Sequence, residues 1–377
     1  MPGQHERALE ALHRRGRLRS LQLPRGTDFT SNDYLALAQS GELRAAIADA
    51  LERGVPVGAG GSRLLRGHHP EHEALESEAA SYFGAEAALY FGSGFAANTA
   101  IFSTLPGRGD LVVYDALIHA SAHDGMRLSK AATAAVPHND PQAFDDVIVA
   151  WRKAGGMGMP WIAVESLYSM DGDCAPLASL AEIAGRHDAM LIIDEAHATG
   201  VLGPGGRGLG ADLEGRANIV TLHTCGKALG VSGALILSSR VICDYLINRA
   251  RAFIYATAPS PLMAAGVRAA LRISADGQHR RSKLSALVDF AGRELLAKTG
   301  IVASGSQIQP VILGADTRAV AIAGAMQQRG FDIRAIRPPT VPEGTARLRL
   351  TLTLHSDEND VAALIAAIAA EQSRLAA

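Results

Sequence analysis

The chain has 377 residues, of which 48% are hydrophobic and 20% are charged, and its formal net charge is −2. These shares are typical of globular proteins, and the length favours about two or three domains. A charge so close to zero gives no electrostatic basis for binding nucleic acid or an acidic membrane surface.

The cysteines and the N-terminus bear on the cellular compartment. Cys174, Cys225 and Cys243 lack metal-type spacing and are too few for a disulfide scaffold, which favours a reducing compartment. The first 20 residues carry charges throughout and lack the apolar core of a secretory signal, and no uncharged apolar run is long enough to span a membrane. We therefore expect a soluble cytoplasmic protein.

The N-terminal region predicts a short arm ahead of a larger domain. A basic amphipathic helix is expected over residues 5–20, and its arginines are typical of a solvated helix face. Residues 28–37 predict a strand followed by a turn. Helical spacing over residues 72–83 ends at Gly84, a residue that commonly closes helices.

From residue 87 to residue 194 the sequence alternates between short apolar strands and helices. The predicted strands are 87–91, 111–114, 133–136, 161–165 and 190–194, and the helices are 95–105, one through His123 and Leu128, 144–154 and 177–186. Two further strands, 218–222 and 233–237, flank Lys227. Strands that are apolar on both faces indicate an α/β fold with a mainly parallel sheet covered by helices on both sides. In such sheets ligands bind at the carboxyl ends of the strands.

After about residue 265 the pattern changes to a smaller α+β domain. It predicts strands 308–313, 332–336 and 347–353 and helices 319–328 and 359–372. Residues 347–352 alternate strictly between arginine or threonine and leucine, which predicts a strand with one solvated face. The predicted domains are an N-terminal helical arm and strand (1–37), a large α/β domain (38–265) and a C-terminal α+β domain (266–377).

Lys227 lies between two apolar strands in a tight connection with Gly226, Gly230 and Gly233. Burying an ammonium costs free energy and favours the free amine, which is the form that condenses with carbonyl groups. The alternative is a surface lysine on a glycine-rich loop.

Two other features lie at predicted strand ends. Gly92–Asn98 is a glycine turn running into a helix, where unpaired N–H groups and the helix dipole favour a phosphate. Asp194 ends a buried strand and needs a cation or strong donors. A metal, a helix cap and a protonated pyridine nitrogen are all possible partners for this carboxylate.

Three further motifs have weaker signals. His119 follows the strand 111–114 and is a candidate for catalysis or for a structural role. The acidic residues of 169–173 suggest a calcium loop but lack the remaining ligand spacing. Gly203–Gly208 fits G-x-G-x-x-G as a string, but it contains proline and opens no apolar helix, so the dinucleotide context is missing.

A phosphate-binding glycine turn, Asp194 with His197 three residues on, and Lys227 in a tight loop together indicate pyridoxal 5′-phosphate (PLP). The lysine would bond to the cofactor aldehyde, the aspartate would hold the pyridinium proton, and the helix N-terminus would take the phosphate.

Several motifs match one family in order over nearly the whole chain. They are SNDYLAL, GAGGSR, SGFAAN, DALIHAS, SMDGDCAPL, DEAHATG, TCGKALG, YATAPSP and IRPPTVPEGTARLRLTL. This series resembles the α-oxoamine synthases, which are fold type I PLP enzymes that act as close homodimers and condense an amino acid with an acyl thioester. The resemblance implies a mainly parallel seven-stranded sheet in the large domain.

The resemblance implies roles at matching positions around the cofactor. Lys227 matches the Schiff-base lysine, and Asp194 matches the partner of the pyridine nitrogen. His197 matches the residue near the ring hydroxyl, and His119 the imidazole stacked on the ring. The remaining cofactor contacts would be Gly94 and Phe95 on the phosphate side, with Ser169 and Thr224 as side-chain contacts.

It also implies substrate-binding positions. Arg337 resembles the arginine that takes the amino-acid carboxylate, Arg19 and Thr340 match positions that contact substrate, and Asn32 lies in a motif that lines the site. Tyr255 and Thr257 fall in the segment that reaches the partner subunit's site, so each site would be shared across the dimer. Ala36, Cys174 and Ala256 depart from the commoner family pattern, without removing a group that the mechanism requires.

Within the family, residues 335–342 favour a member that condenses L-alanine with a pimeloyl thioester, carried by CoA or by acyl carrier protein. The alternatives are sister synthases that use glycine or serine, a non-catalytic PLP-fold binding protein, and a dinucleotide oxidoreductase. No metal is expected.

Overall fold

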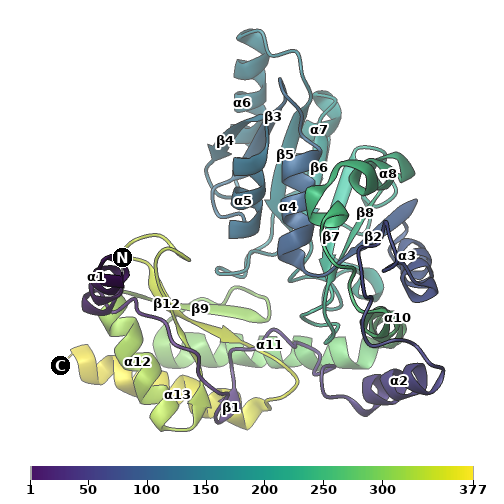
Figure 1. Cartoon of the computed structure of the whole chain (residues 1–377). Helices are drawn as coiled ribbons and strands as arrows, with labels where there is room; N and C mark the ends of the chain where they lie inside the picture. The colour runs from purple at the N-terminus through teal and green to yellow at the C-terminus, as the bar shows by residue number, and fades with distance from the viewer. Residues whose placement is uncertain (1, 377) are drawn as a thin grey trace. The chain divides into compact units, whose positions relative to one another are not determined.

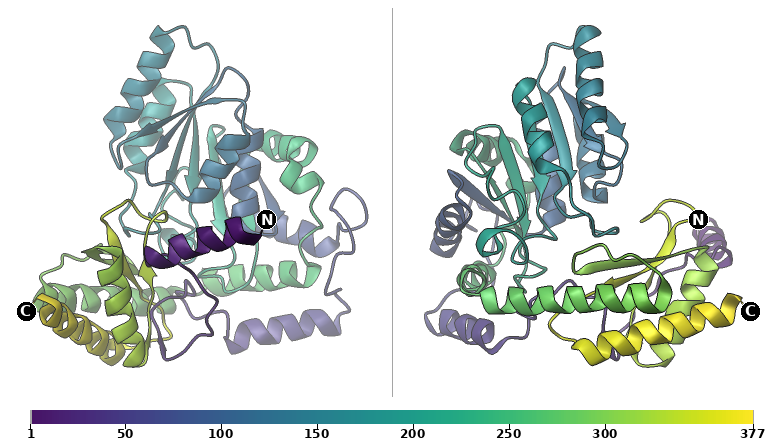
Figure 2. Two further views of the ribbon diagram at one scale, coloured as in Figure 1. Left: turned by 60° about the vertical axis from the view of Figure 1, so that its left-hand side comes forward. Right: turned by 180° about the vertical axis from the view of Figure 1, so that it is seen from behind.

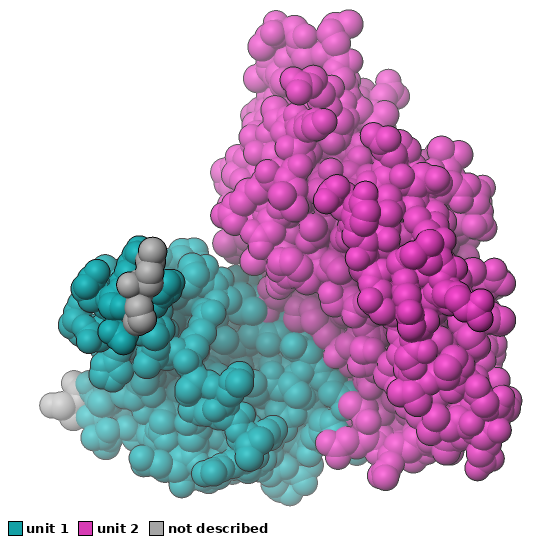
Figure 3. Space-filling model, in the orientation of Figure 1, with its two compact units in different colours: residues 1–34, 170–173, 282–377 teal, residues 35–169, 174–281 magenta. Residues whose placement is uncertain are grey.

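The computed structural model describes residues 2–376, which form two compact units, coloured separately in Figure 3. The larger unit comprises Leu35–Ser169 and Cys174–Arg281. The smaller unit comprises the residues up to Tyr34, Met170–Asp173 and the residues from Ser282 onward. The N-terminal segment therefore packs with the C-terminal residues, and 266–281 pack with the larger unit. The division into three domains that the sequence analysis expects stays a prediction.

A seven-stranded sheet forms the centre of the larger unit, in the order β2-β8-β7-β6-β5-β3-β4. The strands are β2 (Ala87–Phe91), β3 (Leu111–Asp115), β4 (Ala132–Val136), β5 (Pro160–Glu165), β6 (Met190–Asp194), β7 (Ile219–Thr224) and β8 (Ala234–Ser238). The five strands from β7 to β4 run parallel, and β8 runs antiparallel to both β2 and β7. The mainly parallel seven-stranded sheet predicted from the sequence is confirmed.

Helices cover both faces of this sheet (Figures 1 and 2). The helices of this unit are α2 (Gly41–Glu52), which packs on α10, and α3 (Pro70–Phe83), α4 (Gly94–Thr104), α5 (Ala120–Leu128), α6 (Pro141–Lys153), α7 (Leu177–Arg186), α8 (Arg240–Arg249), α9 (Arg251–Ile254) and α10 (Pro261–Ala275). Alternate residues of one strand face opposite layers. In β2, Leu89 packs with α4, α5 and α8, whereas Tyr90 packs with α3 and α10. Because both faces are covered, every residue of five of the seven strands (β2, β5, β6, β7 and β8) is buried.

The smaller unit contains two small sheets and three helices of its own. Its elements are α1 (Pro2–Arg14), β1 (Thr27–Asp28), β9 (Ile308–Gly314), α12 (Asp316–Gln328), β10 (Phe331–Asp332), β11 (Ala335–Ile336), β12 (Ala346–Thr351) and α13 (Glu358–Ala376). One sheet is antiparallel in the order β11-β12-β9, and the other is the parallel pair β1-β10. Helix α11 (Gln278–Thr299) begins in the larger unit and ends in the smaller one.

Two predicted elements of the smaller unit are wrong in extent. The expected helix over residues 5–20 ends at Arg14, and Gly16 then takes a positive φ of 64°, which turns the chain away from the helix. The expected strand over 332–336 is two short strands with different partners, because β10 pairs with β1 and β11 pairs with β12.

The solvated face predicted for residues 347–352 is also wrong. Strand β12 is the middle strand of its sheet, and Arg347 and Arg349 are only 3% and 8% exposed. Arg347 Nη1 donates to Asp171 Oδ1 at 2.5 Å, and Arg349 Nη2 donates to Asn32 Oδ1 at 3.0 Å. Alternation showed that the two faces differ in polarity, but the polar face is buried against oxygen acceptors.

The Arg347 contact predicts a measurable loss of stability. Arg347→Ala leaves Asp171 without its cation, and removing one partner of a buried pair costs about 3 kcal/mol. We expect the loss of stability to lie at the lower end of the usual range for buried pairs, because the Asp171 side chain is 28% exposed. The control is Arg14→Ala, whose pair with Glu10 is 3.9 Å long and exposed on both sides; it should cost less than about 0.5 kcal/mol. Equal losses in urea denaturation would contradict the assignment.

None of the helices within residues 2–376 is both long and apolar enough to cross a membrane.

Candidate active site

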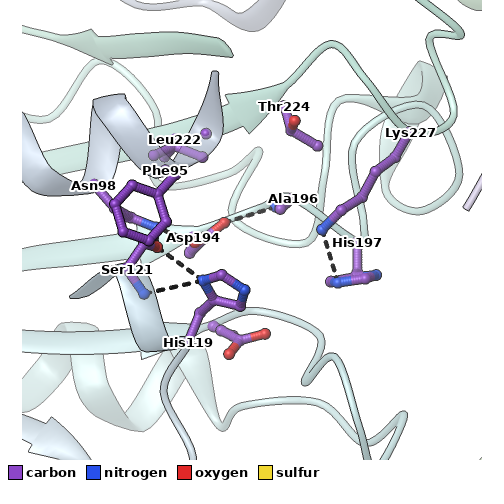
Figure 4. Close-up of a pocket in the computed structure, with 12 residues that line it drawn as sticks. Phe95, Asn98, His119, Ser121, Asp194, Ala196, His197, Leu222, Thr224 and Lys227 are labelled. Carbon is purple, nitrogen blue, oxygen red and sulfur yellow. Dashed lines mark hydrogen bonds between the residues drawn. The ribbon is translucent and has the colours of Figure 1, made fainter. Parts of the chain in front are cut away.

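A pocket of about 180 Å³ lies at the carboxyl ends of β5, β6 and β7 in the larger unit (Figure 4). Its lining residues come from four strand ends or the turns after them and from two helix N-termini. They are Gly94, Phe95, Asn98, His119, Ser121, Glu165, Asp194, Ala196, His197, Leu222, Thr224 and Lys227. Parallel strands end at the same edge, and the register places Glu165 beside Asp194 and Asp194 beside Leu222. This is the edge at which the sequence predicted ligand binding.

Lys227 is held by a hydrogen-bonded turn between β7 and β8. Cys225 N donates to the Gly233 carbonyl and Val231 N to the Cys225 carbonyl, each at 2.9 Å. Gly230 has a φ of 68°, and a Cβ there would lie 2.4 Å from the Ala38 backbone nitrogen. Only glycine fits such a position. The small residues around the lysine therefore let the chain turn tightly and present one amine.

The amine of Lys227 points at His197, as Figure 4 shows. Lys227 Nζ lies 2.7 Å from His197 Nε2, and His197 is 4% exposed. His197 comes from the turn after β6, three residues beyond Asp194. The structure thus brings together the two side chains that the sequence placed about 30 positions apart.

Asp194 is a buried carboxylate with both oxygens fixed. Oδ1 accepts from Ala196 N at 2.9 Å and Oδ2 accepts from Asn98 Nδ2 at 2.7 Å, and the residue is 7% exposed. Two fixed donors set the orientation of the carboxylate before any ligand arrives. A buried carboxylate without a cation would be costly, so this group is prepared for a cationic partner.

A hydrogen-bonded chain runs from Asp194 to His119. Asn98 Nδ2 donates to Asp194 Oδ2 and, at 2.9 Å, to Ser121 Oγ. Ser121 Oγ lies 2.8 Å from His119 Nδ1, and Ser121 N donates to the same nitrogen at 3.2 Å. Because Nδ1 accepts from a backbone N–H, the neutral ring carries its proton on Nε2.

The surroundings of His119 favour its neutral form. The ring is accessible from the pocket, yet desolvation by the surrounding protein lowers its pKa below 6.5. Among the charges, Asp194 opposes this shift and Lys227 supports it. At neutral pH the ring is therefore an uncharged imidazole with a defined tautomer.

Helix α4 begins at the pocket with Gly94 and Phe95. Ser93 caps the helix by accepting from Ala96 N through its side chain, at 3.1 Å. The N–H groups of Gly94 and Phe95 have no partner within the helix, because the first turn lacks preceding carbonyl groups. Such N–H groups and the helix dipole favour an anion, and the phosphate contact expected for Gly94 and Phe95 stays a prediction. Thr224 lies opposite, with its Oγ1 within 3.6 Å of the place where a Cβ on Gly94 would lie.

Three polar residues of the pocket, Asn98, Ser121 and Glu165, were missed by the sequence reasoning, as were the apolar Ala196 and Leu222. Asn98 and Ser121 were inside quoted motifs, and Glu165 was recognised only as the end of a strand. The signal for Asn98 was its place one helical turn after Gly94, on the face that the helix turns toward the strand ends. Glu165 had the same signal as Asp194, since both are acids that end a buried strand.

Ser169 and Thr257, which were predicted to contact the cofactor, and Tyr255, which was predicted to contact substrate, lie outside the pocket lining. Ser169 is 7% exposed, and its backbone N–H donates to Glu165 Oε2 at 3.0 Å. Tyr255 is 71% exposed, with the Arg251 guanidinium stacked over its ring at 4.8 Å, and Thr257 is also exposed. The role predicted for each of them stays a prediction.

Four of the predicted substrate residues, Arg19, Asn32, Arg337 and Thr340, belong to the smaller unit, and His119 and Tyr255 belong to the larger one. Arg19 Nη2 donates to Thr340 Oγ1 at 3.2 Å, so the structure brings these two together. Arg337 donates to the Gly16 carbonyl, and Asn32 accepts from Arg349. Their predicted contacts with substrate stay predictions.

The glycine motif 203–208 serves the protein and not a dinucleotide. Within it only Pro204–Gly206 is helical, as a single 3-10 turn. The following residues wrap the buried carboxylate of Glu195, which accepts from Leu209 N at 3.1 Å, Gly210 N at 2.5 Å and Ser166 Oγ at 2.6 Å. Among residues 2–376 no group of three or more His, Cys, Asp and Glu side chains is arranged to hold a metal.

Comparison with other proteins agrees with this site. The family model described as aminotransferase class I and II matches residues 24–368. The 8-amino-7-oxononanoate synthase of Chromobacterium violaceum is 41% identical over 95% of this chain and 94% of its own length. That of Anaeromyxobacter sp. (strain K) is 43% identical over 96% of this chain and 94% of its own length.

Solved structures give the same relationship. The 8-amino-7-oxononanoate synthase of Francisella tularensis superposes with a TM-score of 0.79 at 28% identity, covering 93% of this chain and 99% of that one. A serine palmitoyltransferase with PLP superposes with a TM-score of 0.84 at 26% identity, covering 92% and 87%. These matches confirm the resemblance found in the motifs. The chain therefore belongs to the aminotransferase class I and II family, in the branch that contains the 8-amino-7-oxononanoate synthases.

Proposed function

We propose that this protein is a PLP-dependent 8-amino-7-oxononanoate synthase of biotin synthesis. It would condense L-alanine with a pimeloyl thioester, carried by CoA or by acyl carrier protein, and release 8-amino-7-oxononanoate, CO₂ and the free thiol carrier. The observation that carries the proposal is the pocket that holds Lys227 Nζ, the fixed carboxylate of Asp194 and the N-terminus of α4 together. Identity of 41–43% to named synthases over nearly the whole chain supports the choice of reaction.

The donor set of the pocket fits PLP. Each charged or polar part of that cofactor has a counterpart here: Lys227 for the aldehyde, Asp194 for the pyridine nitrogen and the Gly94 and Phe95 amides for the phosphate. The imidazole of His119, accessible from the pocket, offers an uncharged flat surface for a ring. His197 would contact the ring hydroxyl, and Ser169 and Thr224 would add side-chain contacts.

When bound, PLP supplies an aldehyde that condenses with amines and a ring that takes up the electron pair released at an amino-acid Cα. Lys227 Nζ would hold the cofactor in the resting enzyme. With alanine bound, Nζ would be the base that takes the proton from the alanine Cα and later returns one to the product. His197 Nε2, 2.7 Å from Nζ, keeps the amine oriented and shares its proton.

Asp194 keeps a proton on the pyridine nitrogen, and its two fixed donors prevent it from turning away. His119 Nε2–H is a neutral donor that would point into the pocket, where it could assist the acyl-transfer or decarboxylation step. The Asn98–Ser121 link ties its tautomer to the carboxylate, because Asn98 donates to both Asp194 and Ser121.

Substrate recognition is proposed from the resemblance for residues of both units. Arg337 would pair with the alanine carboxylate through a charge-assisted contact, and Arg19, Asn32 and Thr340 would contact substrate. We further propose a cytoplasmic homodimer in which Tyr255 and Thr257 reach the partner subunit's site. The exposure of both residues in a single chain supports this.

Measuring the turnover of L-alanine, glycine and serine, the amino acids of this synthase and its sister synthases, tests the proposal. With pimeloyl-CoA as donor, we expect product from L-alanine and little or none from glycine or serine. Repeating the assay with pimeloyl-acyl carrier protein distinguishes the two carriers. Faster turnover of serine or glycine with a different acyl thioester would replace the proposal with one of the sister synthases.

A further inference from the structure

Glu165 is an acid in the pocket to which no role has been given. It ends β5 beside Asp194, it is 2% exposed, and it lines the pocket with Lys227. Its Oε2 accepts from Ser169 N at 3.0 Å. Its Oε1 is buried and makes no hydrogen bond within the described residues. A buried polar atom without a partner is rare in folded proteins and needs a physical reason.

The charge of Glu165 decides what Oε1 can do. Burial raises the pKa of Glu165 to about 8, and the negative charge of Asp194 adds to the rise. The positive charge of Lys227 and the hydrogen bonds of Ser169 oppose it but are weaker. His119 and His197 are the other titratable groups in the pocket beside these two. The pKa of His119 is lowered, so its ring stays uncharged at neutral pH, and His197 contacts Lys227 Nζ.

The position of the proton follows from the contacts. Oε2 accepts a backbone N–H, so the proton of the neutral acid belongs on Oε1. That atom is then an O–H donor without a partner on a residue that lines the pocket, in which Asp194 already has two donors and Lys227 already contacts His197. A donor without an acceptor in the protein is available for a bound molecule.

We propose that Glu165 is a neutral carboxylic acid whose Oε1–H donates a hydrogen bond to an oxygen atom of the molecule bound beside Lys227. The inference rests on the proposed function, because it takes that molecule to be PLP or the substrate joined to it. The acceptor oxygen comes from one of these two. The competing role is an anion that balances the charge of Lys227.

Two substitutions of the same length separate the neutral donor from the anion. Glu165→Gln keeps a donor and removes any charge, whereas Glu165→Met keeps the volume and removes both. We expect the Gln protein to bind PLP and alanine within about threefold of wild type. The Met protein should lose about tenfold in one of the two affinities, the loss that follows from leaving an acceptor unpaired in a buried site.

The affected affinity identifies the acceptor. PLP affinity is measured from the absorbance of the protein–cofactor complex, and alanine affinity from the change in that absorbance. If the Met protein binds PLP more weakly when no alanine is present, the acceptor belongs to the cofactor. If only its affinity for alanine falls, the acceptor belongs to the substrate. Equal losses in the Gln and Met proteins, or no loss in either, would overturn the inference.

An infrared measurement tests the protonation state without any ligand. The difference spectrum of wild type minus Glu165→Gln should contain the carbonyl stretch of a protonated carboxylic acid at pH 7, and the band should vanish as the pH rises through about 8. No such band at pH 7, with a Glu165→Gln protein whose circular dichroism matches wild type, would overturn the inference. Failure of the wild type to bind PLP would instead count against the proposed function, so the two failures are distinguishable.

Discussion

Replacing Lys227 with alanine is expected to remove catalysis almost completely, with a loss of at least about 10³-fold in kcat. The loss combines two functions of one amine, since Nζ both holds the cofactor and moves the proton at the amino-acid Cα. His197 cannot replace it, because its imidazole is not a primary amine that can bond to the cofactor aldehyde, and the ring is buried. Turnover of alanine and pimeloyl-CoA by the purified variant measures the effect.

A surface lysine provides the matched control. Lys130→Ala removes the same side chain from an exposed position just after α5, and its kcat should equal that of wild type. Addition of small primary amines should restore part of the activity of the Lys227→Ala protein if the missing amine is the cause. A Lys227→Ala protein that retains more than about a tenth of wild-type kcat would show that another group moves the proton.

Replacing Asp194 with asparagine is expected to lower kcat by about 10²–10³-fold while PLP remains bound. The magnitude is that of losing one preorganised electrostatic contact to a charge that develops in the transition state. The variant keeps an acceptor for Ala196 N but loses the negative charge that holds a proton on the pyridine nitrogen. Steady-state kinetics and the cofactor content of the purified protein check both parts of the expectation.

The control for this variant is Asp146→Asn, an isosteric change at an exposed position on α6. It should leave both kcat and PLP content unchanged. An Asp194→Asn protein with wild-type kcat would mean that the carboxylate only positions Asn98 and Ala196. A variant that no longer binds PLP would instead make Asp194 a cofactor-affinity residue.

The large sheet was predictable because its sequence pattern is compatible with only one arrangement, a sheet that is buried on both faces. Strand 87–91 and residues 190–193 of β6 are apolar throughout, which burial of both faces explains, and helices separate the strands at the spacing that parallel strands require. The predicted ends of these elements were also close to the observed ones. Gly84 closes α3, Ser93 caps the start of α4 and Asp194 ends β6.

The smaller unit was less predictable because its contacts are distant in sequence. The alternation of β12 indicates one polar face but not whether water or protein covers it. Arg347 is buried because residue 171 returns to it from 176 positions away, and no local pattern contains that information. The short strands β1 and β10 have the same origin, as they exist only as partners of each other.

The residues of the site also divide into those that the sequence could predict and those that it could not. Lys227, Asp194 and His197 were predictable because each breaks a local rule, with a charged or titratable group where the surrounding residues are buried or tightly turned. Asn98 and Ser121 break no rule, since polar residues are common in the first turns of helices. Their role appears only when the fold places both between Asp194 and His119.

The most direct test of the account is the position at which PLP bonds to the chain. The protein is incubated with PLP, treated with borohydride to make any bond between the cofactor and a lysine permanent, digested and analysed by mass spectrometry. The chain has five lysines, so the other four serve as internal controls. The account predicts a pyridoxyl group on Lys227 and on no other lysine. A label on a different lysine, or no label after incubation with PLP, would contradict it.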